Sequence, residues 1–250
     1  MNKFQIRKII QLVFLGLSLL LLLFLIPHQN GSCHQFCPYS QICFGRLTLS
    51  GVFIYLPAVI LGLLIAISTI FIGRIFCGYL CFLGTIQEYI FRLNHQKKKK
   101  RMPPKIHRFL GMFKYLIFLI TLILAILNLQ YLYFDFCPIV SLSTLSAITI
   151  WGIITLGLIF ILGFFIERFW CRYLCPYAAL MNIFQFMGKK LKIKRHVIKR
   201  NMEVCVDCYL CTKNCSMNID LTQYEEVTDP NCIYCLQCVK KCPKKGCLTC

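Results

Sequence analysis

Four long apolar runs dominate the hydrophobic pattern of this chain. They fall at about 9–26, 52–72, 109–133 and 148–166, and short polar stretches separate them. Each run reaches the roughly 17–25 residues that a helix needs to cross the hydrocarbon of a bilayer. The first run is longer than the roughly 7–15 residues of a signal-peptide core, and no A-x-A cleavage pattern follows it. The pattern therefore predicts four transmembrane helices.

Basic residues flank these runs and predict their orientation. The chain has 28 Lys and Arg against 9 Asp and Glu, a formal net charge of +19. Clusters such as "KKKKR" at 97–101 and "KKLKIKR" at 189–195 mark the cytoplasmic side of a membrane. We expect a multi-pass protein of the cell (inner, cytoplasmic) membrane with both termini in the cytoplasm. Attraction to the lipid bilayer explains the basic charge, so we expect no nucleic-acid partner.

The membrane part contains an internal duplication. "QFCP" at 35–38 and "DFCP" at 135–138 each precede a span that ends in the pattern R-x-x-C-x-Y-L-C. The repeats cover about 34–95 and 134–188 and run in the same direction through the bilayer. Parallel repeats are related by an axis along the membrane normal, so their matched elements face each other. The sequence predicts an all-α membrane domain over residues 1–200, built from two parallel repeats.

Four cysteines occupy matched positions in these repeats, at the inner edge of the membrane. Residues i and i+4 share a helix face, so each pair can present two sulfurs, and the four thiols can converge. A further iron–sulfur cluster is the first interpretation, a thiol or disulfide redox pair the second, and small buried core residues the third. Arg74 and Arg168 either offset the charge of a cluster or are ordinary flanking charges. The four cysteines are Cys77, Cys81, Cys171 and Cys175.

Cysteines on the outer side leave two alternatives open. Cys37 and Cys137 match by repeat and could form a second redox site. A disulfide among Cys33, Cys37 and Cys43 is the other interpretation, since disulfides persist outside the cytoplasm. A quinone site needs an apolar slot and a proton acceptor near one face, for which Glu88 is a candidate on the inner side.

The tail, residues 201–250, carries the strongest chemical motif. "CVDCYLCTKNC" at 205–215 and "CIYCLQCVKKCP" at 232–243 both fit C-x₂-C-x₂-C-x₃-C, the ligand run of bacterial ferredoxins. In two-cluster proteins the fourth cysteine of each run ligates the other cluster. Zinc needs four ligands on one ion rather than two crossing runs, so iron–sulfur chemistry is favoured. The expected cluster sets are Cys205, Cys208, Cys211 and Cys242, and Cys232, Cys235, Cys238 and Cys215.

The tail should therefore fold as a small α+β bacterial-type 2[4Fe-4S] ferredoxin domain. Ser216 follows the first run, where the ligand pattern normally has Pro. Two further cysteines of the tail, Cys247 and Cys250, are surplus to these sets, and we interpret them as free thiols near the end of the chain.

Together these motifs resemble the NapH/NosR-type, polyferredoxin-like membrane 4Fe-4S binding proteins. "GRIFCGYLCFLGTIQEYI" and "ERFWCRYLCPYAALMNIF" beside the double ferredoxin tail carry the resemblance, although the first element has Phe82 where the second has Pro176. The resemblance implies single-electron transfer between a cytoplasmic donor or quinone pool and a membrane or extracytoplasmic partner. The chain would then be an electron-transfer component of an oxidoreductase, such as a quinol dehydrogenase subunit.

The alternative function is a redox assembly factor that reduces a metal or thiol for another membrane enzyme. The sequence is compatible with homo- or hetero-oligomers and does not name the redox partner protein.

Overall fold

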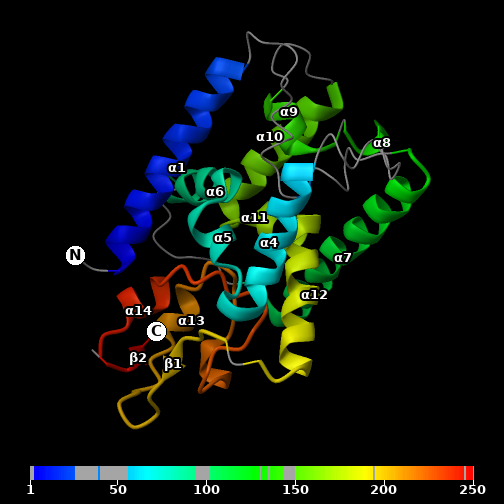
Figure 1. The fold of residues 1–250 in the computed structure, drawn as a ribbon. Coiled ribbons are helices and arrows are strands. Elements are labelled where there is room, and N and C mark those ends of the chain that lie inside the picture. Colours follow the sequence, from blue (N-terminus) through cyan, green and yellow to red (C-terminus); the bar gives the residue numbers. More distant parts are fainter. Residues whose placement is uncertain are drawn as a thin grey trace.

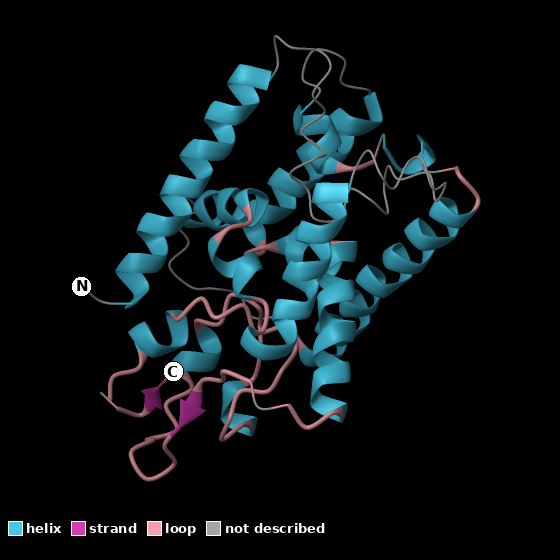
Figure 2. Cartoon of the chain, viewed as in Figure 1, coloured by secondary structure: helices cyan, strands magenta, loops and turns pink. Residues whose placement is uncertain are grey.

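The structure is a computed structural model that describes residues 3–25, 39, 56–93, 102–129, 131–134, 136–143, 150–193, 195–244 and 246–249. Figures 1 and 2 show helices packed together above a small C-terminal unit, with both chain ends near that unit. The helices of the first part are α1 (Lys3–Leu25), α4 (Leu56–Ile72), α5 (Ile75–Tyr79), α6 (Phe82–Leu93), α7 (Pro104–Ile126), α8 (Tyr131–Phe134), α9 (Pro138–Ser143), α10 (Ile150–Phe165), α11 (Phe169–Tyr173) and α12 (Pro176–Lys190). The C-terminal unit contains β1 (Lys199–Arg200), α13 (Leu210–Lys213), the 3₁₀ helix η3 (Leu221–Gln223), α14 (Gln237–Lys241) and β2 (Leu248–Thr249).

Each of the four apolar runs contains a helix, namely α1, α4, α7 and α10. Within the described residues, α7 is long and apolar enough by itself to cross a bilayer. The apolar helices at Ile60–Ile72 and Ile150–Phe165 are shorter. The mostly helical architecture is thus as expected, while four crossings stay a prediction.

Large apolar side chains face outward on these helices. Val13 on α1 is 60% exposed, Leu64 on α4 59%, Phe109 on α7 64% and Ile161 on α10 64%. Soluble monomers rarely expose contiguous apolar surface of this kind. The outer faces of the helices are therefore suited to contact with lipid.

The two repeats fold alike around their paired cysteines. In both, a long helix is followed by a five-residue helix and then by a longer one: α4, α5, α6 and α10, α11, α12. The Cys81 N–H donates to the Phe76 carbonyl at 3.1 Å, and the Cys175 N–H donates to the Trp170 carbonyl at 2.9 Å. Cys81 and Cys175 consequently stand directly before α6 and α12, at the N-terminal ends of those helices.

The C-terminal unit begins slightly before the boundary that the sequence indicates. β1 pairs with β2 in an antiparallel sheet, with Lys199 opposite Thr249 and Arg200 opposite Leu248. Ile198 is buried in the core of the unit. Two residues that precede position 201, Lys199 and Arg200, thus supply the first strand of this small sheet.

Close contacts dock the C-terminal unit onto the two repeats. A Cβ built at Gly78 would lie 2.1 Å from the Ile233 carbonyl oxygen, so only glycine fits beneath that carbonyl. Arg7 of α1 donates to the Cys235 carbonyl at 3.1 Å. Arg172 in the second repeat, which matches Gly78 by position, donates to the Ser216 carbonyl. Both repeats thus contact the part of the tail around Cys215 and Cys235.

Candidate functional site

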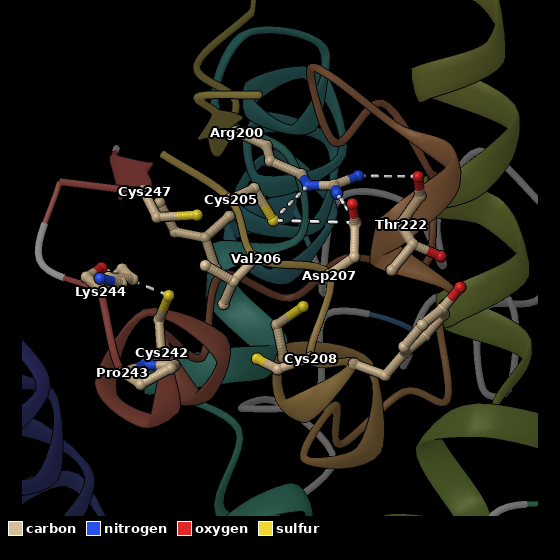
Figure 3. Close-up of a pocket in the computed structure, with 13 residues that line it drawn as sticks. Arg200, Cys205, Val206, Asp207, Cys208, Thr222, Cys242, Pro243, Lys244 and Cys247 are labelled. Atoms are coloured by element: carbon tan, nitrogen blue, oxygen red, sulfur yellow. Dashed lines mark hydrogen bonds and ion pairs between the residues drawn. The ribbon is translucent and has the colours of Figure 1, made fainter. Parts of the chain in front are cut away.

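The first cavity lies in the C-terminal unit (Figure 3). We call it cavity 1, and it is lined by the four cysteines of one set that the spacing predicts: Cys205, Cys208, Cys211 and Cys242. Cys208 is exposed and the other three are partly buried. The loop before α13 supplies the first two, α13 supplies the third, and the end of α14 supplies the fourth.

The second cavity also lies within the C-terminal unit, and its Cys235 packs in one buried cluster with Cys77 and Cys175 of the repeats. We call it cavity 2, and it is lined by the other set, Cys215, Cys232, Cys235 and Cys238. The remaining lining residues are apolar, and they are Ile198, Met217, Ile219, Leu221, Ile233 and Leu236. The structure therefore brings together both crossed sets, with the fourth cysteine of each run among the first three of the other.

The backbone of both runs curls in the same unusual way. Asp207 and Tyr209 flank the second cysteine of the first run, with φ of 46° and 58°. Tyr234 and Leu236 flank the second cysteine of the other run, with φ of 52° and 56°. Residues in the left-handed region turn successive N–H groups to one side and make concavities that bind anions, iron–sulfur clusters included. The donor set and the backbone of each cavity thus fit a cubane held by thiolates.

In each cavity a side chain from outside the cysteine set forms a hydrogen bond with a cysteine sulfur. In cavity 1 the Arg200 Nε donates to the Cys205 Sγ at 3.2 Å, and the same guanidinium pairs with Asp207 (Figure 3). In cavity 2 the Ser216 Oγ lies 3.6 Å from the Cys235 Sγ. Once Cys235 is a thiolate its sulfur can only accept, so the hydroxyl donates. Ser216 stands where the ligand pattern normally has Pro, and its hydroxyl therefore supplies a hydrogen bond that Pro could not.

The four thiols at the membrane edge also come together. The Cys81 and Cys171 side chains share a hydrogen bond, and Cys77 and Cys175 lie close enough to affect each other electrostatically. The hydrogen bond from Cys171 lowers the pKa of Cys81 to about 6; burial opposes this shift, and the Gly84 N–H adds to it. Cys81 is thus the thiol of this group best prepared to act as a thiolate.

Two buried arginines each form a hydrogen bond with the backbone of a paired cysteine in the other repeat. Arg168 of the second repeat donates to the Cys77 carbonyl of the first at 2.5 Å. Arg74 of the first repeat donates to the Cys171 carbonyl of the second at 3.4 Å. Both arginines are 0% exposed. They are therefore interior charges beside the thiols rather than ordinary flanking charges at a membrane surface.

Glu88 neutralises part of this buried positive charge. Its carboxylate is 2.6 Å from Arg7, 2.7 Å from Arg168 and 2.5 Å from Arg92. Burial alone would raise the pKa of Glu88, but Arg168 and Arg7 outweigh it and hold the pKa well below its ordinary range. Glu88 is thus a permanent carboxylate that joins α1 to both repeats, and it does not suit the role of a proton acceptor for quinol.

The remaining cysteines have different outcomes. Cys37, Cys33, Cys43 and Cys250 lie outside the described residues, so the outer pair is not tested. Cys137 is buried at the start of α9, where its carbonyl accepts from the Ser141 N–H at 3.0 Å. Cys247 is buried and lines cavity 1, a place that its position near the chain end did not suggest.

All fourteen cysteines within the described residues have free thiols. In this part of the chain no group of three or more His, Cys, Asp or Glu side chains is drawn around a single metal ion.

Comparison with known proteins agrees with the thiol chemistry. The 4Fe-4S binding domain family matches this chain twice, at residues 54–101 and 148–194, one match in each repeat. Two uncharacterized proteins of Methanocaldococcus jannaschii are similar to the chain. One is 32% identical over 184 residues (72% of this chain and 73% of that protein), the other 35% over 198 residues (77% and 70%).

The chain is also 29% identical over 206 residues to the putative electron transport protein YccM of Escherichia coli, covering 78% of this chain and 56% of YccM. Longer relatives include the regulatory protein NosR of Pseudomonas aeruginosa, which is 29% identical over 182 residues, 69% of this chain but 24% of NosR. No solved structure matches. The chain belongs to the NapH/NosR-type family of membrane 4Fe-4S binding proteins.

Proposed function

We propose that this chain is a membrane-anchored iron–sulfur protein that relays single electrons between its cytoplasmic tail and a partner in or beyond the membrane. The observation that carries the proposal is the placement of two thiol-lined cavities in a row that leads to four further thiols at the membrane edge. The name of YccM, a putative electron transport protein, supports the same function.

We assign one [4Fe-4S] cluster to each cavity. Cys205, Cys208, Cys211 and Cys242 hold the first, and Cys232, Cys235, Cys238 and Cys215 hold the second. Bound there, a cubane accepts and releases one electron at a time. The chain contributes the thiolates, the curled backbone that faces a negative group, and one hydrogen bond to a sulfur in each cavity.

The exposed side of cavity 1 suits exchange with a soluble redox partner, because Cys208 is open to solvent. Cavity 2 is lined by apolar side chains and four cysteines. Cys77 and Cys175 belong to the same buried cluster as Cys215, Cys232 and Cys235. In the proposed relay, electrons therefore pass through the cluster of cavity 2 between cavity 1 and the four cysteines of the repeats.

We assign a third iron–sulfur site to Cys77, Cys81, Cys171 and Cys175. The match of the 4Fe-4S binding domain family to both repeats supports this assignment, since each match contains one cysteine pair. Arg74 and Arg168, both fully buried, supply positive charge that offsets a cluster of thiolates.

Membrane anchoring follows from four crossings by α1, α4, α7 and α10, with both termini in the cytoplasm. The outward apolar faces of these helices support the crossings, and the chain ends near one unit support the orientation (Figure 1). Lys114, early in α7, is buried and donates to Asn231 of the tail at 2.6 Å, so its charge points to the cytoplasmic side.

Mixing experiments test the electron relay. Protein reduced under anaerobic conditions is mixed with a soluble menaquinone analogue or with a redox partner protein, and cluster oxidation is followed by absorbance. We expect rapid oxidation that slows at least about tenfold when Cys81 and Cys175 are both replaced by Ala. Oxidation of both proteins at the same rate would show that the membrane-edge thiols are not on the route.

The hydrogen-bonded pair Cys81 and Cys171 favours a second candidate, a redox assembly factor that reduces a metal or thiol for another membrane enzyme. Reduction of Cu(II) by the reduced protein, together with inertness toward quinone, would support this candidate over the relay.

A further inference from the structure

Cavity 1 contains a fifth thiol. Cys247 lines it together with the four cysteines assigned above, and its residue is 3% exposed. Its sulfur points from the chain end toward Cys205, across the cavity from the Cys242 side (Figure 3). The Cys205, Cys242 and Cys247 side chains line the same cavity and interact with one another, and the Cys247 Sγ donates to the Asn201 carbonyl at 3.9 Å.

The fold holds Cys247 in place independently of any ligand. Its carbonyl accepts from the Asn201 N–H at 2.8 Å, and its own N–H donates to the Lys244 carbonyl at 3.4 Å. The next residue, Leu248, pairs with Arg200 in the two-stranded sheet, and Arg200 bonds the Cys205 sulfur. The same short sheet thus positions both Cys205 and Cys247 at cavity 1.

Cys242 is held less firmly than Cys247. It follows α14, is only partly buried, and its sulfur donates to the Lys244 carbonyl at 3.4 Å. In cavity 2, by contrast, the described lining includes four cysteines, and Cys215 in the position equivalent to Cys242 has no neighbouring fifth thiol there.

We propose that Cys247 is a reserve ligand for the iron–sulfur cluster of cavity 1 and takes over the iron that Cys242 releases. In the exchange the bond between iron and the Cys242 sulfur breaks, and that thiolate takes up a proton. The Cys247 thiol gives up its proton as its sulfur bonds the same iron. No electron is transferred, so the cluster keeps its oxidation state. The inference rests on the cluster assignment under the proposed function.

The reserve ligand suits the position of cavity 1. Its cluster lies at the solvent side of the tail, where exchange and oxidative loss of a ligand are fastest. Cavity 2 is enclosed by apolar side chains and needs no such protection. The spare thiol, that of Cys247, therefore lies at the more exposed of the two proposed clusters.

Alanine variants of the full-length protein, purified without oxygen, test the proposal. The set is Cys242→Ala, Cys247→Ala, the double variant and Cys215→Ala as the matched control. Iron and acid-labile sulfide are counted per chain, and the EPR spectrum of the reduced protein is recorded. The signal of the cavity 2 cluster serves as an internal check that the tail of the cavity 1 variants has folded.

We expect Cys242→Ala and Cys247→Ala each to keep the iron of the wild-type protein, and the double variant to lose about four iron atoms. Cys215→Ala should lose or degrade the cavity 2 cluster, because no spare thiol is available there. If Cys242→Ala and the double variant contained the same amount of iron, the reserve role would be overturned, whether that amount equals the wild-type content or is lower. So would loss of iron from Cys247→Ala alone. Wild-type protein without iron would instead overturn the proposed function.

Discussion

The two cavities use the same four-thiol pattern in opposite surroundings. Cavity 1 opens at the solvent side, with exposed Cys208 and a charged donor, Arg200, beside the Cys205 sulfur. Cavity 2 is closed by apolar side chains and has a neutral donor, Ser216, which is 0% exposed. The two cysteine runs are nearly the same, so the difference arises from what packs against them.

What packs against cavity 2 is the pair of repeats. Gly78, Arg172 and Arg7 all contact the backbone around its cysteines. Cys77 and Cys175 of the repeats also pack in one buried cluster with Cys235 of cavity 2. In the proposed relay this difference gives the tail a direction, with cavity 1 toward a soluble partner and cavity 2 toward the repeats. The following variants test that difference, from the largest expected effect to the smallest.

Replacing a buried cysteine ligand of cavity 2 should loosen the tail from the repeats in addition to removing iron. Cys238→Ala in cavity 2 and Cys208→Ala in cavity 1 should each lose about four iron atoms. Cys238 is 6% exposed within the core of the tail, so its loss should also loosen the tail from the repeats. We expect limited proteolysis to release the tail of Cys238→Ala at least about tenfold faster than that of Cys208→Ala. Equal cleavage rates would contradict the structural role of cavity 2.

Breaking the buried ion pairs should destabilise the protein strongly. Glu88→Gln leaves Arg7 and Arg168 buried without their carboxylate, and loss of one partner of a buried pair costs about 3–5 kcal/mol. The matched control is Glu226→Gln, which removes an exposed pair with Lys199 and should cost about 0–1 kcal/mol. Thermal unfolding in detergent measures both. Similar melting temperatures for the two variants would show that the buried network contributes little.

A single methyl group at Gly78 should weaken the docking of the tail. The Cβ of Gly78→Ala would meet the Ile233 carbonyl oxygen at 2.1 Å, so the backbones at Gly78 and Ile233 must move apart. We expect this to lower the free energy of unfolding by about 1–3 kcal/mol. Gly157→Ala is the control, since nothing lies within 4 Å of a Cβ there and Ala favours the helix. Melting temperatures of the two variants distinguish them. An unchanged value for Gly78→Ala would refute the close contact.

The smallest effects concern reduction potential. Arg200→Gln should lower the potential of the cavity 1 cluster, because the guanidinium stabilises the more negative, reduced state. Ser216→Ala should lower the potential of the cavity 2 cluster by less, since a neutral hydrogen bond is weaker than a charge-assisted one. EPR-monitored redox titration measures both shifts. A larger fall in reduction potential for Ser216→Ala than for Arg200→Gln would contradict this expectation.

Local spacing predicted much of this molecule, and long-range packing supplied the rest. The C-x₂-C-x₂-C-x₃-C runs predict the two sets that line the cavities, because their geometry depends on few residues. The repeat predicts that α5 and α11 match. The four apolar runs predict where long helices lie, although within the described residues α7 is the one helix both long and apolar enough to cross a bilayer.

Other features depend on residues far apart in the chain. Arginine beside a span is normally a surface charge, so the burial of Arg74 and Arg168 follows only from the facing repeats. The pairing of Glu88 with Arg7 joins residues 81 positions apart. Cys247 reaches cavity 1 because β2 pairs with β1, a pairing of two residues that has no pattern in the sequence.

Iron and sulfide analysis of the anaerobically purified, full-length protein tests the central claim most directly. Two cubanes in the tail require about eight iron and eight sulfide atoms per chain, and filled membrane-edge thiols add to that number. Cys81→Ala with Cys175→Ala should remove only the excess. A colourless protein that contains zinc, or one with about four iron atoms per chain, would contradict the account.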